Sequence, residues 1–371
     1  MPKLFGRNYT KRQLLDRVGD VSQLIHARRG RTDEGFAQGA DLIEVNNASG
    51  LTFTVLPGRA LDIASASYKG HPIAFRSSPG DVGPAFYDPR GFEWLRGWFG
   101  GLVTSCGMTF TGHPETDSEL ENEEMPLHGR LSYIPARDVS IASNWQDDNY
   151  ALRISGKMRE AVVFGTNLEL TREISTTLGE KCIRLSDRIE NLSVDPSPLM
   201  YVYHCNPGFP LLDAGSRLVL HSELSTEWLE DRPVGPEVYA IAKGPQRRER
   251  DDVFVHHPMA DADDMVHVAL VNDRLELALY WKFKRSEIPI VNQWQHFHRG
   301  TYVTGIEPGN ASMLGRAWNR EHGYLQQIEP GEVRTFNMEI GILDGAPEIR
   351  AFEQQIKEGL KRKSRKSSSR R

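Results

Sequence analysis

The sequence predicts an all-β protein built from large antiparallel sheets, and three observations support this prediction. First, segments in which apolar and polar residues alternate recur along the chain, as in Leu51-Thr52-Phe53-Thr54-Val55. This period of two is typical of strands that bury one face. Second, 33 glycines and 21 prolines favour many turns over long helices. Third, strand patterns do not alternate with helix patterns, which argues against a parallel doubly wound sheet.

Period-two segments account for most of the chain between its two ends. Beyond 51–55, the same pattern occurs at 168–174, 183–189, 275–283 and 336–342. Short polar turns separate these segments, among them Leu178-Gly179-Glu180 and Glu329-Pro330-Gly331. Short turns between such strands predict antiparallel neighbours.

Helix patterns occur only near the two ends. Thr10 and Gln13 form a capping-box pair before an apolar face of Leu14, Leu15 and Val18, and Gly19 can end this helix. A second helix is expected near 347–360, where apolar residues recur at spacings of three and four. These residues are Ile349, Phe352, Ile356 and Leu360.

The charge distribution predicts a folded body and a basic tail. Residues 361–371 carry seven positive charges and no negative one. Removing these seven from the total of −5 leaves −12 on residues 1–360. We therefore expect one domain over 1–345, a C-terminal helix over 346–360 and a disordered tail over 361–371. An acidic body argues against nucleic-acid binding by the fold, and the partner of the tail stays open.

Several classes of protein are excluded by simple patterns. No apolar segment approaches the roughly 18 residues that span a bilayer, and the first residues lack the apolar core of a secretion signal. Cys106, Cys182 and Cys205 are too few and too widely spaced for a disulfide framework, which favours the cytoplasm. The phosphate-binding motifs of ATP and dinucleotide enzymes are missing, as are the GxSxG and HExxH motifs.

Three titratable residues stand in unusual local sequences. His128 lies in Leu127-His128-Gly129-Arg130, and His204 follows the apolar segment that ends at Tyr203. Glu307 lies between Ile306 and a Pro-Gly pair. Each of the three is expected at a transition from strand to turn, where a rigid sheet can hold it at a cleft. Singly, each is also consistent with an ordinary packing or turn residue.

Four motifs together make the sequence resemble the aldose 1-epimerases, the galactose-mutarotase-like β-supersandwich proteins. It is most similar to their uncharacterised branch, which is known as a domain of unknown function. The similarity covers roughly residues 1–345, and the motifs occur in the order of the family. They are Leu56-Pro57-Gly58-Arg59-Ala60-Leu61-Asp62-Ile63, Leu127-His128-Gly129-Arg130, Tyr203-His204-Cys205-Asn206-Pro207-Gly208-Phe209-Pro210 and Gly305-Ile306-Glu307-Pro308-Gly309-Asn310.

The resemblance implies an isomerase that acts on a sugar or sugar derivative without a cofactor or metal. By this comparison, Glu307 matches the general base, His204 the general acid, and His128 the histidine that supports ring opening. Arg59 matches an arginine that contacts sugar hydroxyls, with Asp62 as its companion. Cys205-Asn206-Pro207 departs from the Pro-Tyr-Phe that follows the histidine in the well-studied enzymes, so the substrate or reaction can differ.

Further polar residues near the motifs are candidates for binding the sugar. Asn292 and Gln293 lie at a strand end and can bind hydroxyls, although a position at a sheet edge explains them equally well. Arg130 adjoins His128 and is a third candidate. If the sugar is phosphorylated, arginines suit its phosphate. The arginines near the motifs are Arg59, Arg76, Arg96 and Arg130.

Interconversion of anomers needs only two proton transfers. One group removes the proton of the anomeric hydroxyl while another protonates the ring oxygen, and the open aldehyde then rotates and closes again. A carboxylate and a histidine on opposite sides of the sugar suit this chemistry, because their ordinary pKa values of about 4.3 and 6.5 lie near neutrality. Trp94, Trp98 and Trp294 are candidates for apolar faces against sugar C–H groups.

Two other functions stay open. The first is a non-catalytic carbohydrate-binding or sensing protein, which the departures after His204 favour. The second is a metal-assisted isomerase or hydrolase that uses His113, His128, His204 and a carboxylate. The three histidines lack the close spacing of a metal-binding pair, so this function ranks behind the isomerase and the binding protein. A homodimer is one expected assembly.

Overall fold

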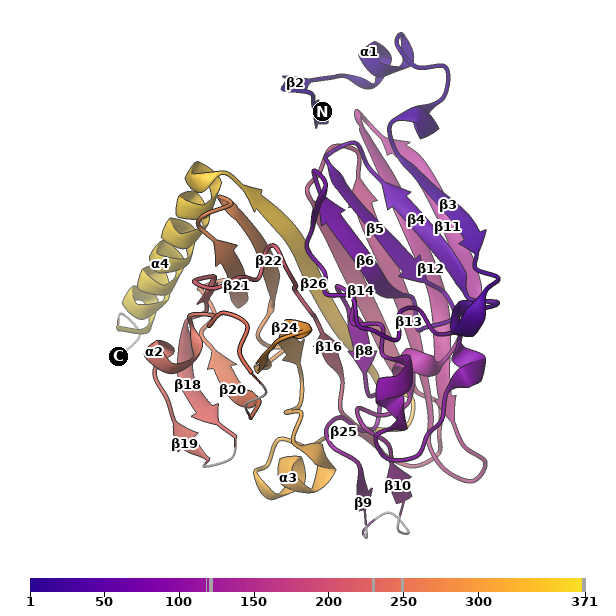
Figure 1. The fold of residues 1–371 in the computed structure, drawn as a ribbon, viewed down its shortest axis with the longest axis vertical. Coiled ribbons are helices and arrows are strands. Elements are labelled where there is room, and N and C mark those ends of the chain that lie inside the picture. Colours follow the sequence, from indigo (N-terminus) through magenta and orange to yellow (C-terminus); the bar gives the residue numbers. More distant parts are fainter. Residues whose placement is uncertain (118, 120–122, 229–230, 248–249, 369–371) are drawn as a thin grey trace.

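The computed structural model describes residues 1–371 except 118, 120–122, 229–230, 248–249 and 369–371. Within these residues, every pair of strands that forms a named sheet is antiparallel, and the sheets dominate the molecule (Figure 1). The prediction of an all-β fold with large antiparallel sheets is therefore confirmed.

The largest sheet of the described residues has eight strands. Its strands are long in the first half, where successive hairpins pair in sequence order. The last long strand of the chain, β26, pairs with both β14 and β22, and so joins the two halves of the sheet. In spatial order the strands are β11 (Arg137–Gln146), β12 (Asn149–Ala161), β13 (Asn167–Thr177), β14 (Cys182–Asn191), β26 (Val333–Asp344), β22 (Leu277–Lys284), β21 (Met265–Asn272) and β17 (Arg217–Val219).

Two further sheets complete the main body. A five-stranded sheet contains β3 (His26–Arg31), β4 (Asp41–Asn46), β5 (Leu51–Leu56), β6 (Asp62–Tyr68) and β7 (His71–Pro72). A seven-stranded sheet contains β19 (Arg232–Pro233), β18 (Ser222–Glu227), β20 (Asp252–Pro258), β23 (Ile290–His298), β24 (Thr301–Gly309), β16 (Val202–His204) and β8 (Thr104–Cys106), in this spatial order. Figure 1 shows the five-stranded sheet beside β11–β14, and β20 and β24 beside β21, β22 and β26.

One continuous apolar core contains side chains from all three sheets. Phe53 of β5, Ile154 of β12, Trp281 of β22 and Ile306 of β24 all belong to it and are almost fully buried. Because side chains alternate between the two faces of a strand, the neighbours of Ile306 point away from this core. Glu307 is such a neighbour, so the period of two that buries Ile306 also places Glu307 on the outer face of the sheet.

Short strand pairs and helices are peripheral to these sheets. The described pairs are β1 (Lys3–Leu4) with β2 (Arg7–Asn8), β9 (Glu115–Asp117) with β10 (Glu123–Met125), and β15 (Ser197–Leu199) with β25 (Gln326–Ile328). The described α-helices are α1 (Lys11–Leu15), α2 (Pro236–Tyr239), α3 (Gly315–Glu321) and α4 (Ala346–Ser368).

The helix predicted at the start of the chain is present but short. Thr10 caps α1, and Thr10 and Gln13 form both hydrogen bonds of a capping box. The helix ends at Leu15, with Asp16 as its C-cap, before the predicted end at Gly19. Only Leu14 of this helix is buried, so little apolar area is available to stabilise a second turn.

The C-terminal helix is longer than predicted. As expected, Ile349, Phe352 and Ile356 are buried, and they pack on the outer face of β21, β22 and β26. The helix continues past residue 360 to Ser368, so the expected disordered tail is helical over most of its length. Residues 369–371 of the expected tail lie outside the described residues.

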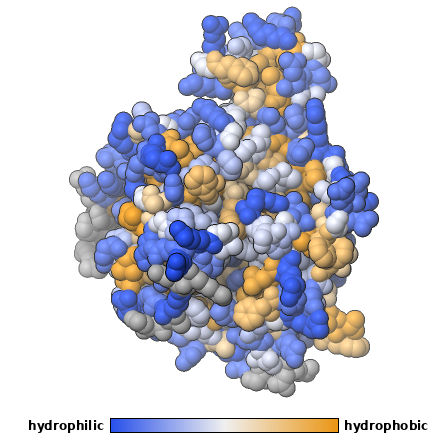
Figure 2. All heavy atoms as spheres, in the orientation of Figure 1, coloured by the Kyte–Doolittle hydropathy of each residue, from blue (hydrophilic) through white to orange (hydrophobic). Residues whose placement is uncertain are grey.

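Figure 2 shows hydrophobic side chains scattered among hydrophilic ones on one face of the molecule. Within the described part of the chain, no helix combines the length and hydropathy needed to cross a bilayer.

Candidate active site

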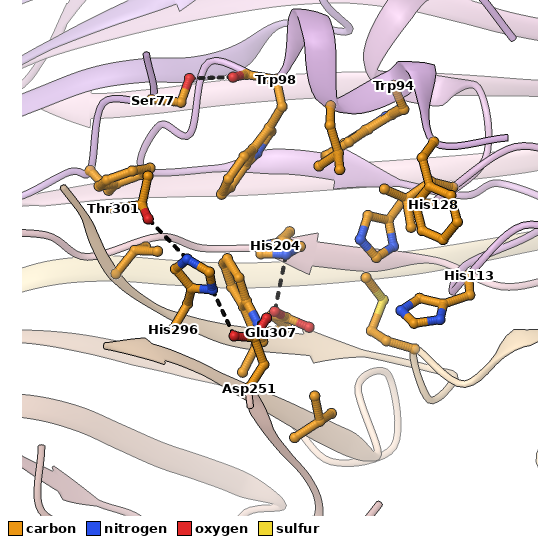
Figure 3. Close-up of a pocket in the computed structure, with 18 of the residues that line it drawn as sticks. Ser77, Trp94, Trp98, His113, His128, His204, Asp251, His296, Thr301 and Glu307 are labelled. Carbon is orange, nitrogen blue, oxygen red and sulfur yellow. Dashed lines mark hydrogen bonds and ion pairs between the residues drawn. The ribbon is translucent and has the colours of Figure 1, made fainter. Parts of the chain in front are cut away.

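A cavity of about 640 Å³ lies on the outer face of the seven-stranded sheet. Loops that precede β8 and follow β10 supply Trp94, Trp98 and His128 to its lining. Strands β16, β20, β23 and β24 supply further lining residues, and the lining is rich in aromatic and imidazole side chains (Figure 3). The histidines that line it are His113, His128, His204, His296 and His298, and the tryptophans are Trp94, Trp98, Trp228 and Trp294.

Strand register explains why His204 meets Glu307. Val202 of β16 pairs with Gly309 of β24, and an isolated bridge joins Cys205 to Ile306. In this antiparallel register His204 lies directly opposite Glu307, and both side chains point away from the core. The distance between His204 Nε2 and Glu307 Oε1 is 3.1 Å. Two residues about a hundred positions apart in the sequence are thus held together by rigid strands.

The contact between these two side chains leaves most of their polar capacity unused. His204 and Glu307 are 4% and 2% exposed. Their contact has the distance of an ion pair but not the direction of a good hydrogen bond, and Glu307 Oε1 and His204 Nδ1 have no hydrogen-bond partner in the structure. Buried polar atoms are nearly always paired, so these two atoms are available to a polar group that enters the cavity.

Burial shifts the pKa values of both groups in the direction that favours their neutral forms. It raises the pKa of Glu307 to about 8 and lowers the pKa of His204 to about 4. At neutral pH the pair therefore holds one transferable proton, and burial favours its location on the carboxyl group. Shifts of this size in a cleft are typical of functional groups.

His128 completes this group, which we call the pocket-floor cluster (His128, His204 and Glu307). The rings of His128 and His204 have centroids 5.6 Å apart at an angle of 71°. Burial, then the proximity of His204 and His113, lowers the pKa of His128 well below its ordinary value. Its Nδ1 is buried without a hydrogen-bond partner. His128 has a positive φ of 57°, and its backbone N–H donates to Gly112 O at 2.8 Å.

Gly305 creates the space that the Glu307 carboxylate occupies. Residues 305 and 307 lie on the same face of β24, and a Cβ atom at position 305 would lie 2.1 Å from Glu307 Oε1. The same Cβ would lie 3.2 Å from His204 Cε1. Glycine at position 305 therefore permits the contact between the carboxylate and the imidazole.

The structure corrects two sequence-based expectations about this pair. Glu307 lies within β24 rather than at a strand-to-turn transition, because the strand continues through Pro308 to Gly309. His204 and Glu307 also lie side by side, so they cannot occupy opposite sides of a sugar in this conformation. Adjacent strands dictate this arrangement, since opposed residues of antiparallel neighbours lie close together.

None of the five expected sugar-binding residues lines the cavity. Arg59 is 1% exposed, donates to Val82 O at 3.0 Å and to Gly97 O at 2.9 Å, and stacks on Tyr133. Asp62 is fully buried, where it accepts hydrogen bonds from Ser105 and contacts Arg172. In this structure the side chain of each residue binds core groups and lies outside the cavity lining.

The other three candidates are also directed elsewhere. Arg130 binds Glu124 O at 3.0 Å and contacts Glu123. Asn292 faces the same side as Glu307 but is fully buried, where it donates to Ala311 O at 3.1 Å. Gln293 lies on the opposite face of β23 from Trp294, and its amide donates to Tyr239 O at 3.1 Å. Of the four arginines considered for a phosphate, none is in the cavity lining.

The cavity contains a second polar group that the sequence reasoning missed. Asp251, His296 and His298 line it beside Trp294, and their ligand-type atoms all lie within 4.8 Å of one another. The sequence contains a signal for this group, since His296 and His298 are two residues apart on one strand and therefore share a face. The metal-assisted alternative considered the other histidines, and among those His128 and His204 belong to the pocket-floor cluster.

The departure from the well-studied epimerases after His204 does not enter the cavity. Cys205 is fully buried on the core side of the strand, as its position next to His204 requires. Asn206 is buried and donates to His204 O and Gly100 O. These residues therefore fix the backbone behind His204.

Comparisons with known proteins agree with this architecture. The model of the family "Domain of unknown function (DUF4432)" matches residues 37–342. No curated protein matches the chain. The solved structures similar to this one include a "putative aldose 1-epimerase" from Klebsiella pneumoniae, which has 24% sequence identity and a TM-score of 0.85 and covers 92% of this chain and 90% of its own.

More distant structures have the same fold. A galactose mutarotase-like protein from Clostridium acetobutylicum has 11% identity and a TM-score of 0.60, with 87% of this chain and 99% of its own covered. Galactose 1-epimerase from Lactobacillus acidophilus has 11% identity and a TM-score of 0.54, with 86% and 99% covered. The galactose-mutarotase-like fold expected from the sequence is thus confirmed, and because the family model spans most of the chain, this protein belongs to the DUF4432 family.

Proposed function

We propose that this protein is a carbohydrate-active isomerase, an aldose 1-epimerase or a related sugar epimerase, in which His204 and Glu307 exchange protons with the substrate. One observation carries the proposal. A histidine and a carboxyl group are held 3.1 Å apart at the floor of an aromatic cavity, with buried polar atoms that have no partner. General acid–base catalysis requires two such groups within reach of one substrate.

The cavity walls suit a sugar. Trp98 lies next to His204, with ring centroids 5.8 Å apart, and Trp294 lies at 5.9 Å from the same imidazole. These rings offer apolar faces to C–H groups close to the proton-transfer pair. The volume of about 640 Å³ accommodates a monosaccharide or a somewhat larger sugar derivative.

Side-by-side groups match the positions of the two oxygens that react. The anomeric hydroxyl and the ring oxygen are bonded to the same carbon, so they lie closer together than the 3.1 Å between His204 Nε2 and Glu307 Oε1. His204 and Glu307 can therefore both reach the two reacting oxygens from one side of the ring. No movement of the sugar between two separate catalytic groups is needed.

The location of the proton decides the direction of the first step. Burial favours a protonated Glu307 and a neutral His204 at neutral pH. In ring opening, His204 then removes the proton of the anomeric hydroxyl while Glu307 protonates the ring oxygen. Ring closure uses the opposite roles and restores the original proton distribution. The roles in the first step are thus the reverse of those that the family resemblance implies.

Anomer-resolved NMR on a panel of aldoses and their derivatives tests the proposal. We expect exchange between anomers of at least one sugar to exceed the rate in buffer alone. Calorimetry on the same panel separates the alternative function, since tight sugar binding without faster exchange would indicate a non-catalytic binding protein. Absence of both binding and exchange across the panel would contradict the assignment to carbohydrates.

A further inference from the structure

We propose that Asp251, His296 and His298 form a binding site for a divalent transition-metal ion, of the zinc type, in the wall of the cavity. These three residues, the cavity trio, contribute one carboxylate and two imidazoles, a mixed N/O set that suits ions such as Zn²⁺. The inference goes beyond the proposed isomerase function, because it concerns metal binding and its test needs no sugar.

The strands bring the trio together by register. His296 and His298 are two residues apart on β23, so their side chains share the face that also carries Trp294. Asp252 of β20 pairs with Gln295, so Asp251, which precedes it, lies opposite His296. Three potential ligands thus come from two neighbouring strands of one sheet (Figure 3 shows Asp251 and His296).

Distances within the trio fit a common ion. His296 Nδ1 lies 2.7 Å and His298 Nε2 lies 3.4 Å from the same oxygen, Asp251 Oδ1. With metal–ligand bonds of 2.0–2.2 Å, adjacent ligand atoms of a tetrahedral site lie about 3.4 Å apart. The contact of His298 already has this separation, and that of His296 needs to open by less than about 1 Å.

Outer hydrogen bonds orient two of the three ligands. Trp294 Nε1 donates to Asp251 Oδ2 at 3.0 Å, which leaves Oδ1 for the ion. His296 Nε2 and Thr301 Oγ1 are 3.0 Å apart, which fixes the ring with Nδ1 toward Asp251. Metal-binding histidines and carboxylates characteristically have such second partners, which set the tautomer and the direction of the ligand atom.

Metal binding relocates a proton in this arrangement. Without an ion, His296 Nδ1 and Asp251 Oδ1 lie 2.7 Å apart, within hydrogen-bond distance. When an ion binds, Nδ1 would coordinate it, and the single proton of the neutral ring would be on Nε2, where it donates to the Thr301 hydroxyl oxygen. The trio is only half-buried, so water and the ion can reach it from the cavity.

Three protein ligands leave coordination positions open toward the cavity. Zinc sites with three protein ligands keep a further position for water or substrate. Here such a position would take an oxygen of a bound sugar, and a substrate with two adjacent oxygens could occupy two positions. If both proposals hold, the ion selects and orients the substrate while the pocket-floor cluster transfers protons.

Calorimetric titration with Zn²⁺ tests the site on the full-length, untagged protein after treatment with a chelator. We expect one zinc ion per chain, and we expect His298→Asn to weaken binding more than tenfold. Thr301→Val, which removes only an outer hydrogen bond, should weaken it about tenfold. His322→Asn, which replaces the exposed histidine that follows α3 as its C-cap, is the matched control and should leave the affinity unchanged.

Cobalt supplies an independent measurement. Co²⁺ at the trio should give visible absorption bands that are absent from His298→Asn and present in His204→Asn. Failure of the wild-type protein to bind zinc would overturn the inference, as would unchanged zinc affinity in a folded His298→Asn protein. Loss of zinc binding in His204→Asn but not in His298→Asn would show that zinc binds at the pocket-floor cluster, and this would also overturn the inference. Zinc binding without anomer exchange would instead support the site while contradicting the proposed reaction.

Discussion

Two buried polar clusters lie back to back across β16, and only one of them is complete. On the core side, the Arg172 cluster is a closed network of ion pairs and hydrogen bonds. On the cavity side, the pocket-floor cluster has buried atoms without partners. Tyr203 belongs to the first cluster and His204, the next residue, belongs to the second. The members of the Arg172 cluster are Arg172, Asp62, Asp187, Tyr201 and Tyr203.

The completeness of the Arg172 cluster indicates a structural role. Arg172 donates to both carboxylate oxygens of Asp187, at 3.0 and 2.8 Å, and contacts Asp62 at 3.2 Å. The hydroxyls of Tyr201 and Tyr203 also donate to Asp187, at 2.5 and 2.7 Å. A buried charge needs all of these partners to compensate for lost hydration. Because the cluster provides them internally, it has nothing left to offer a ligand.

The incompleteness of the pocket-floor cluster supports the functional role proposed for it. Its members are as inaccessible as many core residues, yet His128 Nδ1, His204 Nδ1 and Glu307 Oε1 lack hydrogen-bond partners. Leaving such atoms unpaired costs free energy, so the fold gains nothing from placing them there. The two clusters therefore differ in whether their buried polar atoms have hydrogen-bond partners, and not in burial or charge.

The largest expected effect is on catalysis and follows from Glu307→Gln. The amide keeps the shape of the side chain but cannot exchange a proton with the sugar. We therefore expect anomer exchange to fall by about 10²–10⁴-fold. The free energy of unfolding should stay equal or increase, because no ionisable group is left in the buried site. Anomer-resolved NMR and urea unfolding check the two parts.

Glu321→Gln on the exposed end of α3 is the matched control for this change and should alter neither quantity. Unchanged exchange in Glu307→Gln would remove Glu307 from the reaction. A large loss of stability in this variant would mean that the carboxylate is structural, and the two clusters would then not differ as proposed.

Arg172→Met should have the opposite effect to Glu307→Gln, with a large loss of stability and little change in the rate of anomer exchange. It leaves Asp62 and Asp187 as buried carboxylates without their main cation, which is expected to cost about 3–5 kcal/mol of unfolding free energy. The exchange rate per folded molecule should change less than about tenfold, because Arg172 lies on the far side of β16 from the cavity. Denaturation followed by activity measurements at low temperature separates the two effects.

Arg12→Met is the control for loss of an exposed ion pair. Arg12 contacts Asp16 at 3.1 Å on the surface, so its removal should cost at most about 1 kcal/mol. If Arg172→Met were as mild as this control, the core network would not be holding the sheets together as the contacts indicate.

Gly305→Ala is a smaller intervention that moves the carboxylate without removing it. The new methyl group would lie 2.1 Å from Glu307 Oε1, so the carboxyl group has to turn away from His204. A displacement of about 1 Å at a catalytic group can reduce the rate about 10²-fold, and we expect a loss of this order in exchange. The measurement is the same NMR assay, with circular dichroism to verify folding.

Gly19→Ala is a suitable control, since a Cβ atom at position 19 meets nothing within 4 Å. It should leave exchange unchanged. Full activity in Gly305→Ala would show that the close contact between Glu307 and His204 is not required, and this would weaken the argument from side-by-side geometry.

How far the sequence predicts these clusters depends on where the partners of each residue come from. Their local sequences and the resemblance to a known family singled out His128, His204 and Glu307, which the structure brings together at one cavity. Arg59 and Asp62 could not be assigned in this way, because their partners lie in distant segments that only the fold brings near. A polar residue in a family motif is equally consistent with a ligand contact and with a closed core network.

Strand periodicity contained more information than the prediction used. Gln293 and Trp294 are consecutive on β23, so they cannot both face the cavity, and the aromatic wall takes Trp294. By the same rule, His296 and His298 share the face of Trp294. Their partner Asp251 could not be found from local sequence, because it depends on the pairing of β20 with β23.

The smallest expected effect, when taken per pH unit, is the pH dependence of stability, and it distinguishes the clusters without any substrate. The folded-state pKa of Glu307, about 8, is above its ordinary value of 4.5 because the carboxyl group is buried. The folded protein therefore binds an additional proton between these values. Its contribution to stability is complete below about pH 4.5 and is lost as the pH rises through 8, with a maximum slope of about 1.4 kcal/mol per pH unit.

Urea unfolding at several pH values between 5 and 9, on the wild-type protein and Glu307→Gln, measures this contribution as a difference. We expect the wild-type protein to lose stability relative to the variant as the pH rises, because only the wild type has to ionise a carboxyl group in a dry site. Arg12→Met, which removes only an exposed ion pair, should keep the wild-type slope in this range, since Glu307 is still present in it. Equal slopes in the wild type and Glu307→Gln would mean that Glu307 is already ionised at neutral pH, most simply as an ion pair with a protonated His204. In that case the family roles of glutamate base and histidine acid, rather than the reverse, would describe the first step of the reaction.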